Sequence, residues 1–272
     1  MVLIVVTIIA SLVIAFLLGF LLGLFKKIFS VEVNQKVQDI RDALPGANCG
    51  GCGFAGCDAF AAAVDKGEAP PGGCTVGGAD VAAKLGKLLG MEVSAEKKVA
   101  LLACQGGKDC AQQRGTYVGV ASCLAASLAV NNSKRCSFGC IGLGDCVAAC
   151  PFDALSMGED GIPIVNYSNC VGCGICSKTC PKGLFDIIPM ARKGSAALCR
   201  NRADNRPQIK KDCSVGCIKC GLCEKKCPEH CIFVINGIPE TDYAKCTSCG
   251  VCAKVCPDKV IKMTENVVFV SA

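Results

Sequence analysis

The sequence predicts an α+β protein in which a single N-terminal transmembrane helix precedes a series of small cysteine-rich domains. Three observations lead to this prediction: an uncharged apolar N-terminus, 26 cysteines in 272 residues, and an internal repeat in the second half of the chain. Most of the cysteines lie two or three residues apart, which is too close for disulfide bridges that link distant segments. Metal ligation therefore explains the cysteines better than a disulfide scaffold does.

The N-terminal segment has the length and composition of a membrane anchor. Residues 2–25 carry no charge and, as a helix rising 1.5 Å per residue, would be roughly 36 Å long, enough to cross a hydrocarbon core of about 30 Å. No basic residue precedes this run, as it would in a cleaved signal peptide, whereas Lys26 and Lys27 follow it. The positive-inside rule then places the rest of the chain on the cytoplasmic side. A long helix buried in a soluble core is the alternative.

Helices are expected on both sides of the first cysteine group. Residues 31–44 place an apolar residue at every third or fourth position, and Pro45 ends this helix. A short alanine-rich helix is expected after Cys57. The stretch 79–103 reads as a helix followed by a strand in KVALLAC.

The second half of the chain is an internal duplication. KRCSFGCIGLGDCVAACP at 134–151 recurs as KDCSVGCIKCGLCEKKCP at 211–228, and NCVGCGICSKTCP at 169–181 recurs as KCTSCGVCAKVCP at 245–257. Each half is a pair of cysteine motifs, a repeat that chance does not readily produce. The expected domains are an anchor at 1–27, a four-cysteine domain at 28–90, an intermediate cysteine-containing segment at 91–135, a first module at 136–190, a polar and basic connector at 191–212, and a second module at 213–272.

The repeated motif points to iron–sulfur clusters. Cys-x2-Cys-x2-Cys-x3-Cys-Pro is typical of bacterial ferredoxins, where three cysteines bind one [4Fe-4S] cluster and the fourth binds the other cluster of the pair. Zinc is the alternative, but zinc sites usually combine two cysteine pairs or cysteine with histidine, and His230 is the only histidine. Three complete copies are present: Cys170, Cys173, Cys176 and Cys180; Cys217, Cys220, Cys223 and Cys227; and Cys246, Cys249, Cys252 and Cys256.

The fourth copy departs from the pattern, because Leu143 stands where the repeat has Cys220. We expect Cys136 to supply the missing ligand, although Cys213 could displace Cys220 if the two modules are alike. Exchanging the fourth cysteines within each pair predicts four sets: Cys136, Cys140, Cys146 and Cys180; Cys170, Cys173, Cys176 and Cys150; Cys217, Cys220, Cys223 and Cys256; and Cys246, Cys249, Cys252 and Cys227.

A further set lies near the anchor, in NCGGCGFAGC at 48–57. Its cysteines Cys49, Cys52 and Cys57, together with Cys74, would hold a fifth [4Fe-4S] cluster, and the glycines leave room for it against bare backbone. A zinc site or a purely structural group of thiols is the alternative.

Some cysteines have no assigned role. The interval between Cys199 and Cys213 loosely repeats that between Cys123 and Cys136, which leaves a sixth cluster open; buried free thiols are the alternative. The unassigned cysteines are Cys104, Cys110, Cys123, Cys199, Cys213 and Cys231.

The order of anchor, CGGCGFAGC…C site and ferredoxin motifs resembles the B subunit of the Rnf complex, a membrane-bound ferredoxin:NAD+ oxidoreductase that moves Na+ or H+. The resemblance covers essentially the whole chain, and the two modules are similar to the long polyferredoxin form of anaerobic bacteria. It implies βαββαβ-like modules and a protein that accepts electrons from soluble reduced ferredoxin. It also implies that the electrons pass to partner subunits that carry the flavins and the nicotinamide site.

The residues alone indicate an electron-transfer protein without a substrate-converting site of its own. We find no G-x-G-x-x-G dinucleotide motif, and no basic stripe interleaved with aromatic residues that would bind nucleic acid. A lone transmembrane helix without an ionisable residue cannot conduct an ion, so ion transport must belong to partners. Two other functions stay open: a polyferredoxin that serves a membrane hydrogenase or another reductase, and a metal-binding protein without redox activity.

Overall fold

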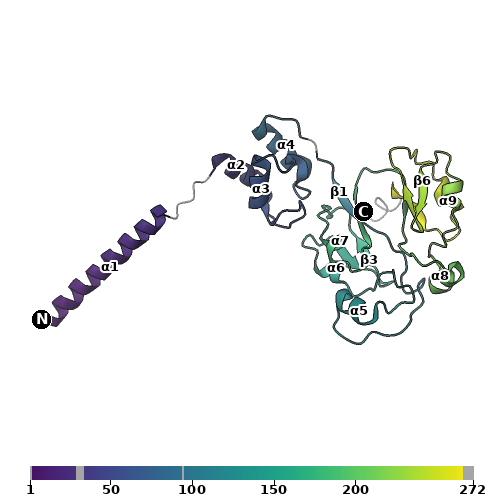
Figure 1. Ribbon diagram of the computed structural model, residues 1–272, viewed down its shortest axis with the longest axis horizontal. Coiled ribbons are helices and arrows are strands. Elements are labelled where there is room, and N and C mark those ends of the chain that lie inside the picture. The colour runs from purple at the N-terminus through teal and green to yellow at the C-terminus, as the bar shows by residue number, and fades with distance from the viewer. Residues whose placement is uncertain (1, 29–33, 94, 266–272) are drawn as a thin grey trace. The chain divides into compact units, whose positions relative to one another are not determined.

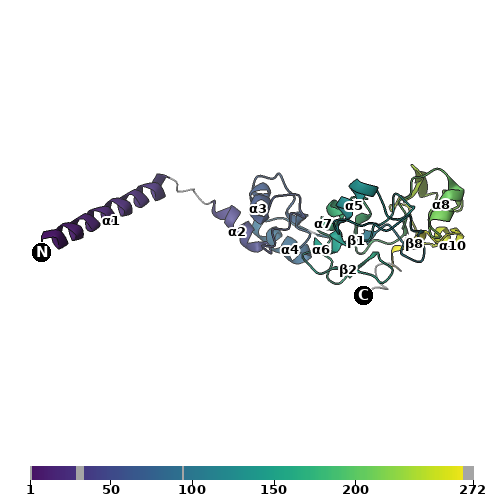
Figure 2. The ribbon, with the colours of Figure 1, turned by 90° about the horizontal axis from the view of Figure 1, so that it is seen from below.

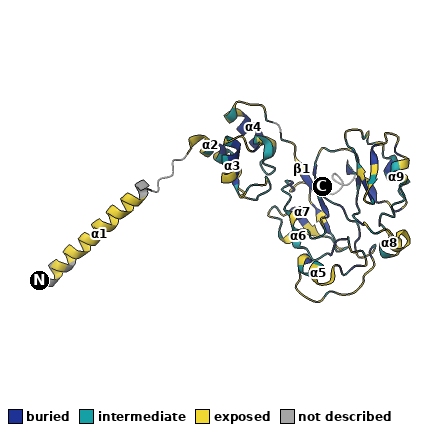
Figure 3. Ribbon diagram, viewed as in Figure 1, coloured by how far each residue is buried: buried dark blue, intermediate teal, exposed yellow. Residues whose placement is uncertain are grey.

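The computed structural model describes residues 2–28, 34–93 and 95–265 (Figure 1). The chain divides into two compact units, Met1–Asp39 and Ile40–Ala272. The first unit contains α1 (Val2–Ile28), whose described side chains are all exposed (Figure 3). Its stretch Ile8–Phe25 is long and apolar enough to cross a membrane. An exposed apolar surface formed by the described side chains of this helix suits lipid rather than water.

Three short helices build the domain around the first cysteine group. The helix expected at 31–44 is confirmed where the structure describes it, as α2 (Gln35–Ala43), and residues 31–33 lie outside the described part. The alanine-rich helix is α3 (Cys57–Asp65), and α4 (Gly78–Leu89) follows the 3-10 turn Pro71–Gly73. Buried Phe60 and Leu85 give this domain a small apolar core.

The described strands pair two by two into antiparallel ribbons. Two ribbons are local hairpins, and the other two join segments far apart in the sequence. The pairs are β1 (Lys98–Leu102) with β4 (Phe185–Pro189), β2 (Leu155–Met157) with β3 (Pro163–Val165), β5 (Ser195–Ala197) with β8 (Ile261–Met263), and β6 (Ile232–Ile235) with β7 (Ile238–Thr241). The strand expected in KVALLAC is confirmed as β1. It completes the first module, just as β5 from the connector completes the second.

Each ferredoxin motif contains a short helix that begins at a glycine. The helices are α6 (Asp145–Ala148), α7 (Ile175–Thr179), α9 (Leu222–Lys225) and α10 (Val251–Val255). Their N-cap glycines have positive φ angles of 84°, 78°, 71° and 72° at Gly144, Gly174, Gly221 and Gly250. Side chains rarely adopt this backbone region, so the glycine before each third cysteine is a conformational requirement of the motif.

The two modules lie side by side in both views (Figures 1 and 2). The segment around Cys110 holds them together: Ser214 N–H donates to the Cys110 carbonyl at 2.9 Å, and Ala111 forms a β-bridge with Cys213. Two further helices, α5 (Cys123–Val130) and α8 (Arg206–Asp212), flank this junction. The intermediate segment and the connector therefore pack within the modules; the domain boundaries themselves stay predictions.

The cores of the modules are built partly of cysteine. In the first module, Val99, Phe185 and Ile188 are packed with buried Cys170 and Cys176. In the second, Ile232 and Ile261 are packed with buried Cys223, Cys227 and Cys252. Because each core has so few large apolar side chains, its stability depends on the group that the thiols bind.

Candidate iron–sulfur sites

Four cavities in the described part of the chain are each lined by four cysteines. Three of them contain thiols that the motifs place together, and the fourth collects Cys136 and three cysteines without an assigned role. The four sets are Cys49, Cys52, Cys57 and Cys74; Cys123, Cys140, Cys146 and Cys180; Cys217, Cys220, Cys223 and Cys256; and Cys104, Cys136, Cys199 and Cys213.

The site nearest the anchor in the sequence brings together the four cysteines expected there. Asn48 Oδ1 accepts a hydrogen bond from Cys57 N–H at 2.8 Å, which ties the start of the glycine-rich loop to the start of α3. Gly77 N–H donates to Cys74 Sγ at 3.3 Å. Burial raises the pKa of Cys74, and the neighbouring Cys57, Cys52 and Cys49 thiolates raise it further. A bound cation would remove this repulsion and draw all four thiols into the thiolate form.

The glycines of NCGGCGFAGC also allow another segment of the chain to approach this loop closely. A Cβ atom added at Gly51 would lie 2.9 Å from Cys173 Cβ and 2.9 Å from the Cys173 carbonyl oxygen. Cys173 belongs to the first module, so bare backbone at Gly51 lets this loop touch a ferredoxin motif. No larger residue fits there without displacing backbone atoms.

In the second module, the exchanged set expected from the motif lines one cavity. Cys217, Cys220 and Cys223 come from one motif and Cys256 from the other. Val260 N–H donates to Cys256 Sγ at 3.3 Å. Cys220 lines this cavity and Cys213 does not, so the structure gives no support to an exchange between those two cysteines.

The first module holds a different set from the one expected. Cys140, Cys146 and Cys180 line the cavity together with Cys123, whereas Cys136 lines another cavity. Leu143, which stands at the position of the repeat's Cys220, instead packs against the apolar cluster of Cys123 and Ile141. The fourth cysteine that lines this cavity thus comes from α5, outside the motif.

Hydrogen bonds explain why Cys123 and Cys136 are placed in this way. Asp145 accepts from Cys123 N–H at 2.8 Å and from Leu124 N–H at 3.1 Å, which fixes the start of α5 beside α6. The Asn132 amide donates to the carbonyls of Cys136 and Gly139, at 2.9 Å each, and holds the turn that carries Cys136. The sequence signal that could have identified Cys123 was its loose counterpart Cys199 in the repeat.

The two remaining expected sets line none of the four cavities. Burial raises the pKa of Cys173, and the thiolates of Cys49, Cys150 and Cys170 raise it as well. Cys170 Sγ accepts from Ala100 N–H at 3.3 Å.

In the second module, burial raises the pKa of Cys252, and the nearby Cys246 and Cys249 thiolates act in the same direction. Their expected partner Cys227 lies 3.4 Å from Cys231, sulfur to sulfur. Cys231 is buried beside this set, and neither it nor Cys110 lines any of the four cavities.

The cysteine sets fit a group larger than a single ion. Among residues 2–28, 34–93 and 95–265, no three Cys, His, Asp or Glu side chains are close enough to hold one metal ion. Tetrahedral zinc at 2.3 Å from each sulfur would need thiols about 3.8 Å apart. Four thiols spread around a cavity fit the larger [4Fe-4S] cluster, which four cysteine thiolates bind.

The fold and these sites define a membrane-associated iron–sulfur protein of the ferredoxin type. Family models agree: an Fe-S cluster domain matches residues 44–76, a 4Fe-4S dicluster domain matches 135–184, and a 4Fe-4S binding domain matches 239–262. The expected fold class is confirmed.

Similar proteins identify the family. The B subunit of the Na(+)-translocating ferredoxin:NAD(+) oxidoreductase complex of Acetobacterium woodii is 45% identical over 220 residues, which are 80% of this chain and 66% of that protein. The B subunit of the ion-translocating oxidoreductase complex of Methanosarcina acetivorans is 43% identical over 191 residues, 70% of this chain and 72% of that protein. Its counterpart in the proton-translocating ferredoxin:NAD(+) oxidoreductase complex of Clostridium ljungdahlii is 40% identical over 193 residues, 70% of this chain and 67% of that protein. The chain belongs to the family of B subunits of ion-translocating oxidoreductase (Rnf) complexes, and the expected resemblance is confirmed.

Proposed function

We propose that this chain is the electron-transfer subunit of a membrane-bound ferredoxin:NAD+ oxidoreductase that translocates Na+ or H+. It accepts electrons from soluble reduced ferredoxin and relays them through [4Fe-4S] clusters to partner subunits. Clusters of this kind supply one-electron carriers, whose potentials depend on burial and on hydrogen bonds to sulfur. The N–H groups of Gly77, Ala100 and Val260, each directed at a ligand sulfur, would provide that adjustment.

The proposal includes five cluster sites, which the motifs and the cavities support. Cys123 takes the place first given to Cys136, because it lines the cavity with the other three thiols. The proposed ligand sets are Cys49, Cys52, Cys57 and Cys74; Cys123, Cys140, Cys146 and Cys180; Cys150, Cys170, Cys173 and Cys176; Cys217, Cys220, Cys223 and Cys256; and Cys227, Cys246, Cys249 and Cys252.

The observation that carries the proposal is the close approach of neighbouring sites. The loop of the site nearest the anchor touches Cys173 of the first module at Gly51. Within that module, burial together with the thiolates of its own set and of Cys146 from the next set raises the pKa of Cys176 to about 12. An electron relay needs contact between sites from separate domains, whereas isolated structural metal sites do not need it.

The membrane anchor fits the same function. Lys26 and Lys27 at its C-terminal end favour the cytoplasmic face for the cluster domains, where soluble ferredoxin is available. No ionisable residue lies within 2–25, so the ion pathway belongs to other subunits.

The test uses the complex purified anaerobically with this protein in place. Changing Cys49 to Ala removes a ligand of the site nearest the anchor and should abolish ferredoxin-dependent NAD+ reduction, while dithionite still reduces the clusters of the ferredoxin modules. Cys110→Ala is the matched control and should keep full activity. Full activity in the Cys49 variant would contradict the relay. A complex that contains a hydrogenase and does not reduce NAD+ would favour the polyferredoxin alternative.

A further inference from the structure

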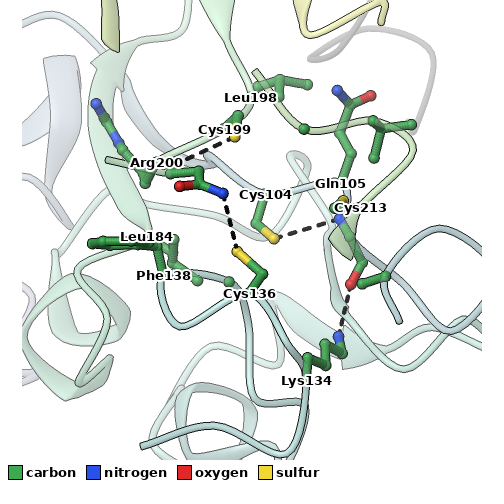
Figure 4. Close-up of a pocket in the computed structure, with 16 residues that line it drawn as sticks. Cys104, Gln105, Lys134, Cys136, Phe138, Leu184, Leu198, Cys199, Arg200 and Cys213 are labelled. Carbon is green, nitrogen blue, oxygen red and sulfur yellow. Dashed lines mark hydrogen bonds between the residues drawn. The ribbon is translucent and has the colours of Figure 1, made fainter. Parts of the chain in front are cut away.

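A fourth cysteine-lined cavity lies where the two modules meet. Its thiols come from four separate segments: the residues after β1, the start of the first module, the residues after β5, and the end of α8. Figure 4 shows the sulfurs of Cys104, Cys136, Cys199 and Cys213 directed toward a common space. The family models cover Cys136 but none of the other three cysteines.

We infer that Cys104, Cys136, Cys199 and Cys213 bind a sixth [4Fe-4S] cluster, which connects the clusters of the first module to those of the second. This inference rests on the proposed electron-transfer function for its connecting role, whereas the site itself rests on the geometry of the four thiols.

Hydrogen-bond donors surround the sulfurs of this site. Gly106 N–H donates to Cys104 Sγ at 3.4 Å, and Asn201 N–H donates to Cys199 Sγ at 3.5 Å. The Asn201 side-chain amide also reaches Cys136 Sγ at 3.7 Å (Figure 4). Neutral thiols of a packed core do not require several donors, but thiolates bound to a cluster are stabilised by them.

A buried cation lies beside the same cavity. Lys134 is 4% exposed, lines the cavity, and donates from Nζ to the Gly106 carbonyl at 2.7 Å. Among the described residues no carboxylate pairs with it. A buried ammonium needs a compensating negative charge, and a [4Fe-4S] cluster with four thiolates carries a charge of about −2.

Hydrogen bonds link this site directly to a site in each module. Cys140, a proposed ligand in the first module, donates from its N–H to Cys104 Sγ at 3.5 Å. Cys217, a proposed ligand in the second module, donates from its N–H to Cys199 Sγ at 3.4 Å. Each ligand backbone therefore touches a sulfur of the junction site, which places a sixth cluster between the two pairs.

The internal repeat accounts for the composition of the site. Cys136 and Cys213 are equivalent positions in the two modules, and Cys123 and Cys199 are loosely equivalent. Because Leu143 replaces a thiol in the first module, Cys123 is used there, whereas the second module has Cys220 and leaves Cys199 available. Cys104 supplies the fourth thiol.

The test of the site counts metal in the full-length protein isolated anaerobically. With four irons per cluster, the wild type should hold about 24 irons and as many acid-labile sulfides, and a Cys136→Ala/Cys199→Ala variant about 20. Cys110→Ala should match the wild type. A wild-type count of about 20, or one zinc that disappears from the double variant, would overturn the site. The wild-type count decides the question even if the double variant does not fold.

The test of the connecting role follows reduction by ferredoxin with rapid-freeze EPR. In the wild type the clusters of both modules should be reduced together. In the double variant the clusters of one module should lose their fast phase of reduction, while dithionite still reduces them. Equally fast reduction of both modules would overturn the connecting role. Failure of ferredoxin to reduce the wild type at all would count against the proposed function and leave the iron count unaffected.

Discussion

Asp145 is expected to control the stability of the first-module site without binding metal. Its carboxylate accepts hydrogen bonds from Cys123 N–H at 2.8 Å, Leu124 N–H at 3.1 Å and Ser122 Oγ at 2.9 Å. It therefore holds the N-terminus of α5, and with it the proposed ligand Cys123, against α6. Asp145→Ala would leave two helix N–H groups without this acceptor.

The size of the effect follows from those contacts. A hydrogen bond to a charged group contributes about 1.5–3 kcal/mol, and loss of a helix cap costs about 0.5–2 kcal/mol. Leu124 is exposed, so water replaces part of the loss, and roughly 2 kcal/mol for the docking of α5 is a conservative value. At 1.36 kcal/mol per factor of ten, local opening at Cys123 becomes about 30-fold more frequent.

The assay is the rate of iron release to a chelator at neutral pH without oxygen. Burial acts to raise the pKa of Asp145, but the hydrogen bonds from Cys123, Leu124 and Ser122 together outweigh it and lower the pKa. The stabilisation is therefore complete above the usual carboxyl pKa and is lost only as the pH falls through the lower folded value. At neutral pH one cluster of the Asp145→Ala variant should lose iron about 30-fold faster than in the wild type.

Two variants make this test specific. Asp145→Asn keeps one acceptor oxygen and should give an intermediate rate, and Asp109→Ala, at an exposed carboxylate, should behave like the wild type. Wild-type rates in Asp145→Ala, or equal acceleration at every cluster, would refute the role assigned to Asp145.

Three further predictions concern contacts at other sites. Gly51→Ala places a Cβ 2.9 Å from Cys173 and should slow electron exchange between the site that contains Cys49 and the first module, measured by rapid-freeze EPR. The control Gly115→Ala meets nothing within 4 Å and should not slow it. An unchanged exchange rate in Gly51→Ala would contradict the role of this contact. Lys134→Met removes a buried positive charge and should lower the reduction potential of the proposed junction cluster in a redox titration. The control Lys108→Met changes an exposed residue and should leave this potential unchanged. An unchanged potential in Lys134→Met would show that Lys134 does not stabilise the charge of the cluster. Removing iron from the whole protein should abolish most of the helix and strand signal in circular dichroism that does not come from α1, because cysteines form part of both module cores. Persistence of that signal would show that the cores are stable without bound clusters.

The cysteines that line the second-module cavity could be predicted from the sequence because they follow a local rule. Three cysteines lie within one turn-rich loop, and the fourth is fixed by the exchange between paired motifs. The structure brings Cys217, Cys220, Cys223 and Cys256 to one cavity as this rule requires. Local spacing determines local geometry here, because a positive-φ glycine and a short helix always place the third cysteine in the same way.

The proposed junction site could not be predicted from spacing, because the cysteines that line its cavity come from four segments. Cys104 reaches it only because β1 pairs with β4, and Cys199 only because β5 pairs with β8. These ribbons are two-stranded and short, and their partners lie far apart in the sequence, so no periodicity shows which segments pair. The position of Cys123, rather than Cys136, in the first-module cavity could not be predicted for the same reason: α5 is held by Asp145 through contacts outside the motif.

Strand β1 also sets the spacing between two of the proposed sites. Ala100 N–H donates to Cys170 Sγ at 3.3 Å, and Cys104, four residues further along, lines the junction cavity. An extended chain rises about 3.3 Å per residue, so the two backbone positions are at most about 13 Å apart. Pairing with β4 over Lys98–Leu102 keeps most of this segment extended. The separation of these sites is therefore fixed by a hydrogen-bonded backbone rather than by long side chains, which is the rigidity that a relay with constant transfer distances requires.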